Sequence, residues 1–178
     1  MAPPSRLTPS LFDKLVADLE ISGLREDDVE SATAGREAMR HYPVPRLERF
    51  NEAALRATVR RDLGWLLNTT QLGAVQDLDA YPHVRTSVLN YGVPDLAGRS
   101  LHRRTILDRA KEIRHALRTF ETRLDGDSLV VEPVGTPDRS ANSVSFLIHG
   151  QIASAVRAMP VQFRTELEAD SASVEVSG

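Results

Sequence analysis

The sequence predicts an α+β protein, because two kinds of hydrophobic periodicity occupy separate parts of the 178-residue chain. Up to Leu124 the apolar residues recur three and four positions apart, as they do on one face of a helix. After Leu124 they alternate with polar residues, as in strands that bury one face. Helices followed by short strands favour two main helices packed on a small, mainly antiparallel sheet of about four strands.

The composition sets limits on the function. Apolar residues make up 41% of the chain, which is enough for a core, and the net charge of -3 argues against a nucleic-acid coat, which needs a concentrated basic face. The chain has no cysteine, so disulfides, thiolate metal sites and cysteine nucleophiles are excluded. We find no secretion signal and no apolar run long enough to span a bilayer, and we therefore expect a cytoplasmic protein.

Three segments are expected along the chain: a helix within residues 1–20, a charged linker at 21–41 and a compact domain at 42–178. Thr8 is the expected N-cap of the first helix, which runs over residues 8–20. Its apolar face consists of Leu11, Phe12, Leu15, Val16 and Leu19. A helix this short needs a surface to dock on, and that surface is either its own domain or a partner.

The first helix of the compact domain is expected from a cap at Asn51 to about Leu67. Its apolar stripe consists of Leu55, Val59, Leu63, Leu66 and Leu67. Gly64 interrupts the helix and disfavours it relative to alanine, so a close approach to a neighbouring element is one reason for its presence.

A second helix is expected from a cap at Ser100 to Phe120. Its apolar stripe consists of Ile106, Ala110, Ile113, Leu117 and Phe120, and its remaining surface carries the basic residues Arg103, Arg104, Arg109, Lys111, Arg114 and Arg118. These cations are either ordinary solvated side chains or a docking face.

Four strands are expected after the second helix, at Ser128–Pro133, Ser143–Ile152, Val161–Leu167 and Val174–Val176. The last two are candidate sheet edges, since an exposed edge offers unpaired N–H and C=O groups to another strand. The sequence leaves open whether one of them pairs with a partner or merely closes the core.

The strongest candidate site is the Glu121-Thr122-Arg123 segment, at the expected corner between the second helix and the first strand. On an extended segment, side chains two residues apart point the same way, so Glu121 and Arg123 would face one partner together. Arginine adds a planar fork suited to bidentate contacts. The alternative from spacing alone is a local salt bridge that contributes about 0–1 kcal/mol.

Several passages together resemble the baseplate wedge family of contractile injection machines, and within it the TssE group of bacterial type VI secretion systems. Family members often read Ser-Val-Leu-Asn-Tyr-Gly-Leu-Pro-Asp-Leu and Phe-Glu-Pro-Arg-Leu, which resemble Ser87–Leu96 and Phe120–Leu124. Shorter likenesses to the group occur at Ser10–Asp13, Arg60–Leu63 and Leu66–Thr69.

The resemblance implies a non-enzymatic structural protein without a cofactor, whose fold is similar to the strand-exchange domain of the sheath. It implies that Glu121 and Arg123 dock into other baseplate subunits (TssF, TssG and TssK), with Thr122 in place of the family's proline. It also implies that a sheet edge primes the sheath subunits TssB and TssC, and that the face of Leu11, Phe12 and Leu15 docks on a partner.

Two alternatives to the assembly role are considered. The wider family has been labelled lysozyme-like, but no pair of carboxylates stands out as glycosidase machinery, and no export signal is visible. The five histidines show no metal-ligand spacing, and no phosphate-binding glycine loop or nucleophile elbow occurs. The second alternative is an unrelated α+β protein-interaction module.

Overall fold

The computed structural model describes residues 10–13, 52–95, 102–134, 143–153, 158–168 and 173–178. The chain divides into two compact units, Met1–Thr58 and Val59–Gly178. The second unit contains the sheet, helix α5 and most of helix α3, and the candidate site lies within it. The expected linker at 21–41 and the expected entry at residues 42–47 lie outside the described residues.

Helix α3 (Glu52–Leu67) ends at the predicted residue, and all five members of its predicted apolar stripe are buried. Space is open around Gly64, because a Cβ built there meets no atom within 4 Å. Close approach to a neighbouring element therefore does not explain this glycine.

Helix α5 (Arg103–Phe120) buries Ile106, Ala110, Ile113 and Leu117, as predicted, while Phe120 is only partly buried. Its N-cap is His102, so the prediction of a cap at Ser100 is wrong. Arg103 and Arg104 are therefore the first two residues of the helix.

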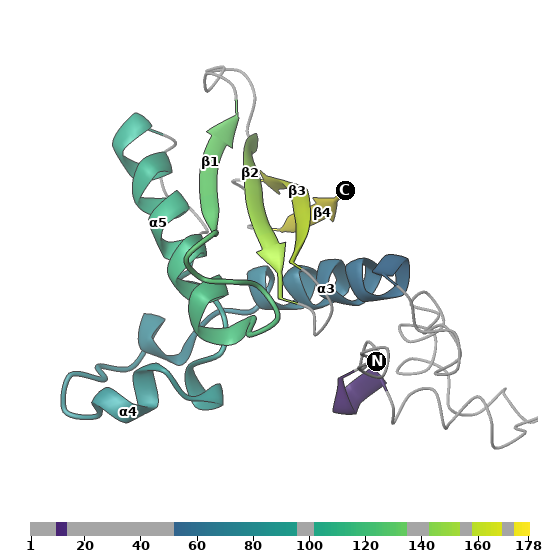
Figure 1. The fold of residues 1–178 in the computed structure, drawn as a ribbon. Helices are drawn as coiled ribbons and strands as arrows, with labels where there is room; N and C mark the ends of the chain where they lie inside the picture. The colour runs from purple at the N-terminus through teal and green to yellow at the C-terminus, as the bar shows by residue number, and fades with distance from the viewer. Residues whose placement is uncertain (1–9, 14–51, 96–101, 135–142, 154–157, 169–172) are drawn as a thin grey trace, which may run out of the picture. The chain divides into compact units, whose positions relative to one another are not determined.

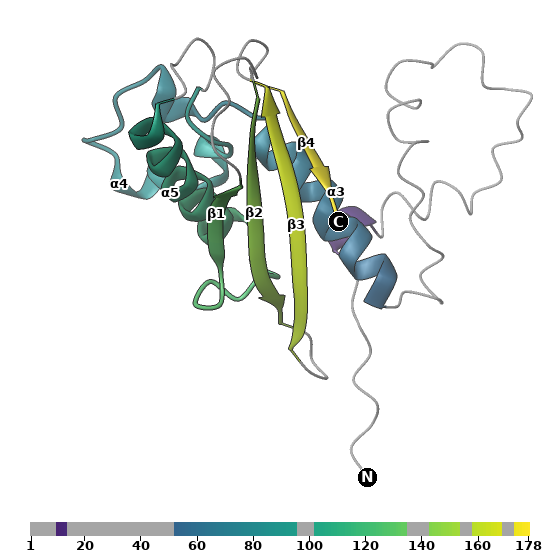
Figure 2. The same cartoon turned by 90° about the horizontal axis from the view of Figure 1, so that it is seen from above.

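Four strands form one antiparallel sheet in the order β1-β2-β3-β4, which confirms the predicted α+β class. They are β1 (Val130–Val134), β2 (Ser143–Ile152), β3 (Met159–Glu168) and β4 (Val174–Ser177). The bounds of β2 are those predicted, whereas β1 begins two residues later than expected and β3 is longer at both ends. Figures 1 and 2 show α5 beside β1 and α3 near β4, on opposite sides of the sheet's width.

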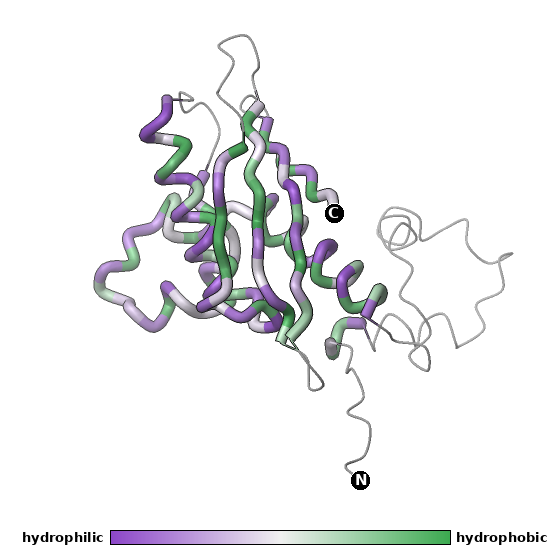
Figure 3. Tube along the Cα trace, turned by 45° about the horizontal axis from the view of Figure 1, so that its top comes forward, coloured by the Kyte–Doolittle hydropathy of each residue, from purple (hydrophilic) through white to green (hydrophobic). Residues whose placement is uncertain are grey.

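The core lies on one face of the sheet, where the alternate residues of β2 and β3 are buried. Figure 3 shows the corresponding alternation of hydrophobic and hydrophilic residues along these strands. Phe146 and Ile148 are 1% exposed and Thr165 is equally buried, its hydroxyl donating to the carbonyl of Phe146 at 3.3 Å. Every second residue of the strands therefore contributes to one apolar layer.

Between the two long helices, the chain forms three short turns of helix, the last of which lies within the Ser87–Leu96 block. They are η3 (Leu72–Ala74), α4 (Pro82–Arg85) and η4 (Val88–Asn90). None of the described helices is long and apolar enough to cross a membrane. Within the described residues no group of acidic and histidine side chains is arranged to hold a metal ion.

Candidate functional site

The Glu121-Thr122-Arg123 segment is a tight turn, so the prediction of an extended segment is wrong. Glu121 is the C-cap of α5, and its N–H donates to the carbonyl of Leu117 at 3.0 Å. The N–H of Leu124 then donates back to the carbonyl of Glu121 at 3.1 Å. Beyond the turn, the carbonyl of Arg123 accepts from the N–H of Ala153 at 2.9 Å, which attaches the turn to the end of β2.

Because the backbone turns, Glu121 and Arg123 bind each other. The Nε of Arg123 donates to Glu121 Oε1 at 2.7 Å, and its Nη2 donates to Oε2 at 2.6 Å. The backbone N–H of Arg123 also donates to Oε1, at 3.1 Å. The same Nη2 contacts Asp62 Oδ2 on α3. This bidentate fork is the local salt bridge that spacing alone favoured, with a second carboxylate added from α3.

The cluster is largely shielded from solvent, and this sets its electrostatics. The side chain of Glu121 is 7% exposed and that of Arg123 is 22% exposed. Burial lowers the pKa of the Arg123 guanidinium, but the hydrogen bond and charge of Glu121, together with Asp62, outweigh it, and the net pKa is raised. Arg123 therefore stays charged, and the unit carries one cation and two carboxylates.

A second arginine joins the cluster through Asp62. The Nε of Arg61 donates to Asp62 Oδ1 at 2.8 Å, on the opposite side of the carboxylate from Arg123. The guanidinium of Arg61 stacks 4.7 Å from the ring centroid of Trp65, which is 39% exposed. Trp65 thus marks where the cluster meets the surface of α3.

The Ser87–Leu96 block lies against the same cluster through Tyr91. Its ring packs edge-on against Phe120, with centroids 5.4 Å apart. Burial raises the pKa of the Tyr91 hydroxyl, and the carboxylates of Asp62 and Glu121 raise it further, against the opposing charge of Arg123. Three of the passages that carry the family resemblance therefore meet in space: Arg60–Leu63 on α3, the Ser87 block and Phe120–Leu124.

Gly92 explains how the Ser87 block reaches α3. It has a φ of 124°, and a Cβ built there would lie 2.2 Å from the carbonyl oxygen of Thr69. The N–H of Val93 donates to that same oxygen at 2.8 Å, and Gln71 N–H donates to the carbonyl of Val93 at 2.9 Å. Only glycine permits this short parallel pairing.

Ser87 and Asn90 hold the block together. The hydroxyl of Ser87 donates to the carbonyl of Val84 at 2.9 Å. Asn90 is buried, and its side chain accepts from Gly73 N–H at 2.8 Å and donates to the carbonyl of Arg85 at 2.9 Å. The polar residues of this motif are therefore structural: they join η3 and η4.

The basic residues of α5 are partly used inside the molecule. Arg109 is 4% exposed and its Nη2 donates to the carbonyl of Asp95 at 2.9 Å, so the prediction that it lies on the solvated surface is wrong. Arg114 donates to the carbonyl of Leu129 at 2.8 Å. Arg118 remains 49% exposed. The exposed cations are thus fewer than the sequence predicted.

The N-terminal segment is described only at residues 10–13. Ser10 and Asp13 form a reciprocal capping box, in which the Ser10 N–H donates to Asp13 Oδ2 and the Asp13 N–H donates to Ser10 Oγ, both at 3.1 Å. Ser10 is therefore the cap, and the prediction of Thr8 is wrong. Leu11 is 74% exposed and Phe12 is 37% exposed, while Leu15 lies outside the described residues.

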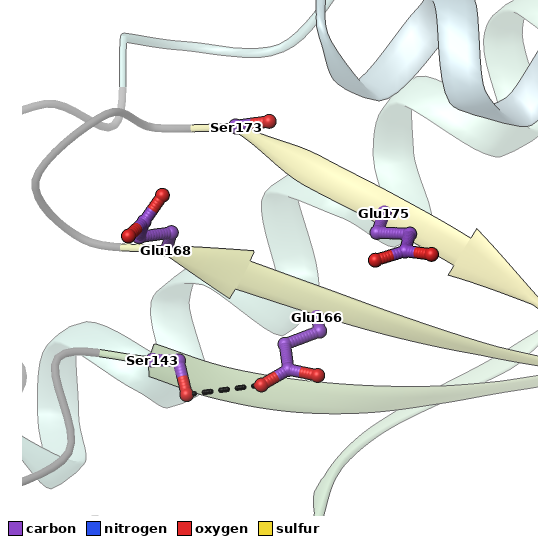
Figure 4. A pocket seen from close by; sticks show the side chains of 5 residues that line it. All are labelled: Ser143, Glu166, Glu168, Ser173 and Glu175. Carbon is purple, nitrogen blue, oxygen red and sulfur yellow. Dashed lines mark hydrogen bonds between the residues drawn. The ribbon is translucent and has the colours of Figure 1, made fainter.

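A hollow with acidic walls lies on the outer face of the sheet (Figure 4). It is lined by Ser143, Glu166, Glu168, Ser173 and Glu175. Glu166 and Glu175 are opposite each other in the β3–β4 register, and Glu166 accepts a hydrogen bond from Ser143 Oγ at 3.1 Å. All three glutamates are exposed, so none has the apolar surroundings that a glycosidase gives its acid.

Two residues of the site region were not predicted from the sequence: Asp62, which binds Arg123, and Asn68, whose side chain binds the backbone of β4. Asp62 lies 61 residues from Arg123 in the sequence. Its place in the family-like Arg-Asp-Leu passage is the one feature of the sequence that could have marked it as a site residue. Asn68, in the Leu-Leu-Asn-Thr passage, accepts from Val174 N–H at 2.9 Å and donates to Val174 C=O at 2.8 Å. Each of these residues lies in a passage that resembles the family.

A comparison with protein-family models gives one match, to the baseplate wedge protein gp25, over residues 53–156. The match spans more than half of the chain, from the start of α3 to just beyond β2. It includes Asp62, the Ser87 block and the Glu121–Arg123 turn. No curated protein and no solved structure matches the chain.

Proposed function

The chain belongs to the baseplate wedge protein gp25 family, and we propose that within this family it is a TssE-like subunit of a bacterial type VI secretion system. Membership makes it a structural baseplate component of a contractile injection system. The TssE assignment is supported by the Ser-Leu-Phe-Asp passage at residues 10–13 and by the Ser87–Leu96 block. The proposed role is positional: it fixes where the sheath begins.

The observation that carries the proposed anchor is the locked orientation of Arg123. Glu121 accepts from two guanidinium nitrogens, so the fork is held at one angle before any partner arrives. About a fifth of the Arg123 side chain stays exposed, next to the exposed Thr122. We propose that this surface docks on the baseplate subunits TssF, TssG or TssK.

Thr122 stands where the family pattern has proline, and the turn supplies the restraint that proline would have given. Hydrogen bonds from Arg123 N–H to the Glu121 carboxylate and from Leu124 N–H to the Glu121 carbonyl close the turn on both sides. A proline at this position fixes φ but adds no contact of its own to the two charged groups. The anchor is therefore preorganised with threonine.

Two further surfaces complete the proposal. The apolar face of the N-terminal helix, with Leu11, Phe12 and Leu15, lies in a groove of a baseplate partner. A sheet edge receives a strand of the sheath subunits TssB or TssC. The protein acts in the cytoplasm, without enzymatic activity and without a cofactor.

The test is affinity purification from the native bacterium with secretion genes expressed, followed by mass spectrometry. Thr122→Tyr places bulk on the proposed surface and leaves the Glu121–Arg123 pair in place, so we expect loss of baseplate subunits from a folded protein. Arg118→Ala, which removes an exposed arginine of α5 that is paired with Asp127, is the control and retains them. Full recovery of the baseplate subunits with Thr122→Tyr would contradict the proposed anchor. Absence of baseplate and sheath subunits in the purification with the natural chain would contradict the assembly role.

A cell-wall digestion assay tests the non-enzymatic part of the proposal. We expect no release of peptidoglycan fragments by the purified chain. Activity that is lost on changing Glu166 or Glu175 to glutamine would replace the structural role with a hydrolytic one.

A further inference from the structure

Two apolar side chains of the Ser87–Leu96 block are exposed to solvent. Val88 is 82% exposed and Leu89 is 68% exposed, and both lie in the short helix η4. Asn90, the polar residue that follows them, is buried. Folding in water favours the opposite arrangement, with apolar side chains inside and an amide outside. Burial in this turn is therefore inverted, and its two exposed residues, Val88 and Leu89, are called the apolar knob.

The knob belongs to a segment that exposes several apolar side chains. Three other large hydrophobic residues between the two long helices are exposed: Leu72, Val75 and Tyr81. Figures 1 and 2 show α4, in the middle of this segment, farther from the sheet than α5. Single exposed apolar residues are ordinary on a protein surface, but several on one short segment are typical of an interaction surface.

The backbone under the knob is fixed by hydrogen bonds, so the exposure does not come from a loose loop. The Ser87 hydroxyl caps η4 by accepting from the Leu89 N–H at 3.3 Å. The buried amide of Asn90 accepts from the Gly73 N–H at 2.8 Å and donates to the Arg85 carbonyl at 2.9 Å. A partner that binds the knob therefore loses little conformational entropy in ordering it, which favours affinity.

The knob is attached to the domain beside the Glu121–Arg123 turn. Tyr91, two positions after the knob, packs edge-on against Phe120 at the end of α5. The N–H of Val93 then donates to the carbonyl of Thr69 at 2.8 Å, which joins the block to the chain just after α3. The knob and the proposed anchor are thus parts of one framework, and each is held in place before a partner binds.

We propose that the knob inserts into an apolar groove of another baseplate subunit, as a contact separate from the Arg123 anchor. This inference rests on the proposed function. The family match covers the whole of η4 and makes the chain a component that assembles with other baseplate proteins, so the occupant is one of these and not a second copy of the chain.

The chemistry of the groove follows from the knob. Val88 and Leu89 protrude and are apolar, so the surface that fits them is concave and lined by apolar side chains. The charged residues Asp79 and Arg85 of the same segment bind each other, so the groove needs no counter-charge for them. The contact therefore depends on apolar burial, and we expect it to change little with salt concentration.

The first test compares two valines of the same segment. Val88→Thr and Val75→Thr introduce the same hydroxyl at positions of nearly equal exposure, so neither should change the urea midpoint of unfolding. Binding is measured by biolayer interferometry between the tagged full chain and the purified TssF–TssG–TssK complex of its bacterium. We expect a Kd about 5–10-fold higher with Val88→Thr and an unchanged Kd with Val75→Thr, because only the first hydroxyl enters an apolar groove. Leu89→Gln, which removes the larger side chain of the knob, should raise the Kd about 10–100-fold.

Each other outcome of this test overturns a stated part of the reasoning. An unchanged Kd with either knob variant, or equal losses with Val88→Thr and Val75→Thr, overturns the inference. A knob variant with a lowered urea midpoint would show that its side chain belongs to the core, which overturns it as well. If Thr122→Tyr weakens binding and the knob variants do not, the anchor stands and the knob is rejected. A natural chain that does not bind the complex overturns the proposed function and this inference with it.

The second test uses the natural full chain and separates a baseplate partner from a second copy. A soluble gadolinium chelate broadens the NMR signals of methyl groups that solvent reaches, and the methyl groups of Leu89 and Val75 are followed. We expect both to be broadened in the free chain, and Leu89 but not Val75 to be protected after the TssF–TssG–TssK complex is added. Protection of Leu89 on raising the concentration of the chain alone would assign the knob to a second copy and overturn the proposal. A Leu89 that stays broadened in the complex, or equal protection of both residues, overturns it too.

Discussion

The Glu121–Arg123 pair should behave as one energetic unit, and a double-mutant cycle measures this. Arg123→Ala removes the guanidinium that binds both oxygens of a carboxylate that is 7% exposed. Breaking a fully buried pair in this way costs about 3–5 kcal/mol, and the partial exposure of Arg123 reduces the expectation to about 2–3 kcal/mol. Glu121→Ala should cost about 2 kcal/mol, because Arg123 keeps Asp62 and some solvent.

The double variant should cost no more than Arg123→Ala alone, because it leaves no buried carboxylate without a partner. The expected coupling energy is therefore about 2 kcal/mol. Urea unfolding at neutral pH, followed by far-UV circular dichroism and by the fluorescence of Trp65, the single tryptophan, gives the four free energies. The pair of Arg118 and Asp127, which is exposed and 3.4 Å apart, is the control and should couple by less than about 0.5 kcal/mol. A coupling of that small size at Glu121 and Arg123 would refute the argument from burial.

Three further predictions follow from backbone geometry, an edge contact and a titrating group. Gly92→Ala should lower the free energy of unfolding in urea by about 3 kcal/mol or more, because a Cβ there meets Thr69 O at 2.2 Å. Gly64→Ala, in open space on a helix, should raise the free energy of unfolding by about 0.5–1 kcal/mol. Equal effects of the two substitutions would contradict this. Asn68→Ala should cost about 1–3 kcal/mol and speed hydrogen exchange in β4, and unchanged exchange would show that the amide does not hold that strand. The pKa of Tyr91 is raised above the unfolded value of about 10, so its contribution to stability is complete below that pH and is lost as pH rises through the folded pKa. The free energy of unfolding should therefore fall less between about pH 9 and 11 in Tyr91→Phe than in the natural chain, and an equal fall in both would contradict the burial of the hydroxyl.

Periodicity was sufficient where a whole element buries one face. The alternation at Ser143–Ile152 fixed β2 to the residue, because a shift by one would turn Phe146 and Ile148 out into solvent. The stripe ending at Leu67 likewise fixed the end of α3. In both cases many side chains indicate the same buried face, so a single atypical residue does not change the predicted element.

Prediction from the sequence was wrong where a single residue determines the direction of the backbone or the end of a helix. The expectation that Glu121 and Arg123 point the same way assumed a strand, but the C-cap of α5 already turns the chain. The cap at His102 was missed because its side chain makes no capping hydrogen bond, so the usual signal is absent. Asp62 was missed as a member of the site because only the folded chain brings it next to a residue 61 positions away.

These failures bear on how the motif should be understood. Glu121 was a candidate for partner contacts, and Asn90 and Asn68 lie in other passages that resemble the family, yet each of the three is bound to groups within this chain. An internally satisfied polar residue does not recognise a partner by itself; it positions neighbours that do. Partner contacts should therefore be sought on exposed residues beside the motif, such as Thr122 and Trp65, more than on its buried carboxylate.

The same argument applies to the sheet. An exposed sheet edge can pair with another chain, and β-sheet proteins prevent this with prolines, short edge strands and covering helices. Here Pro133 and α5 lie at the β1 edge, and the Asn68 side chain occupies the N–H and the C=O of Val174 on β4, so groups of this chain protect part of each edge.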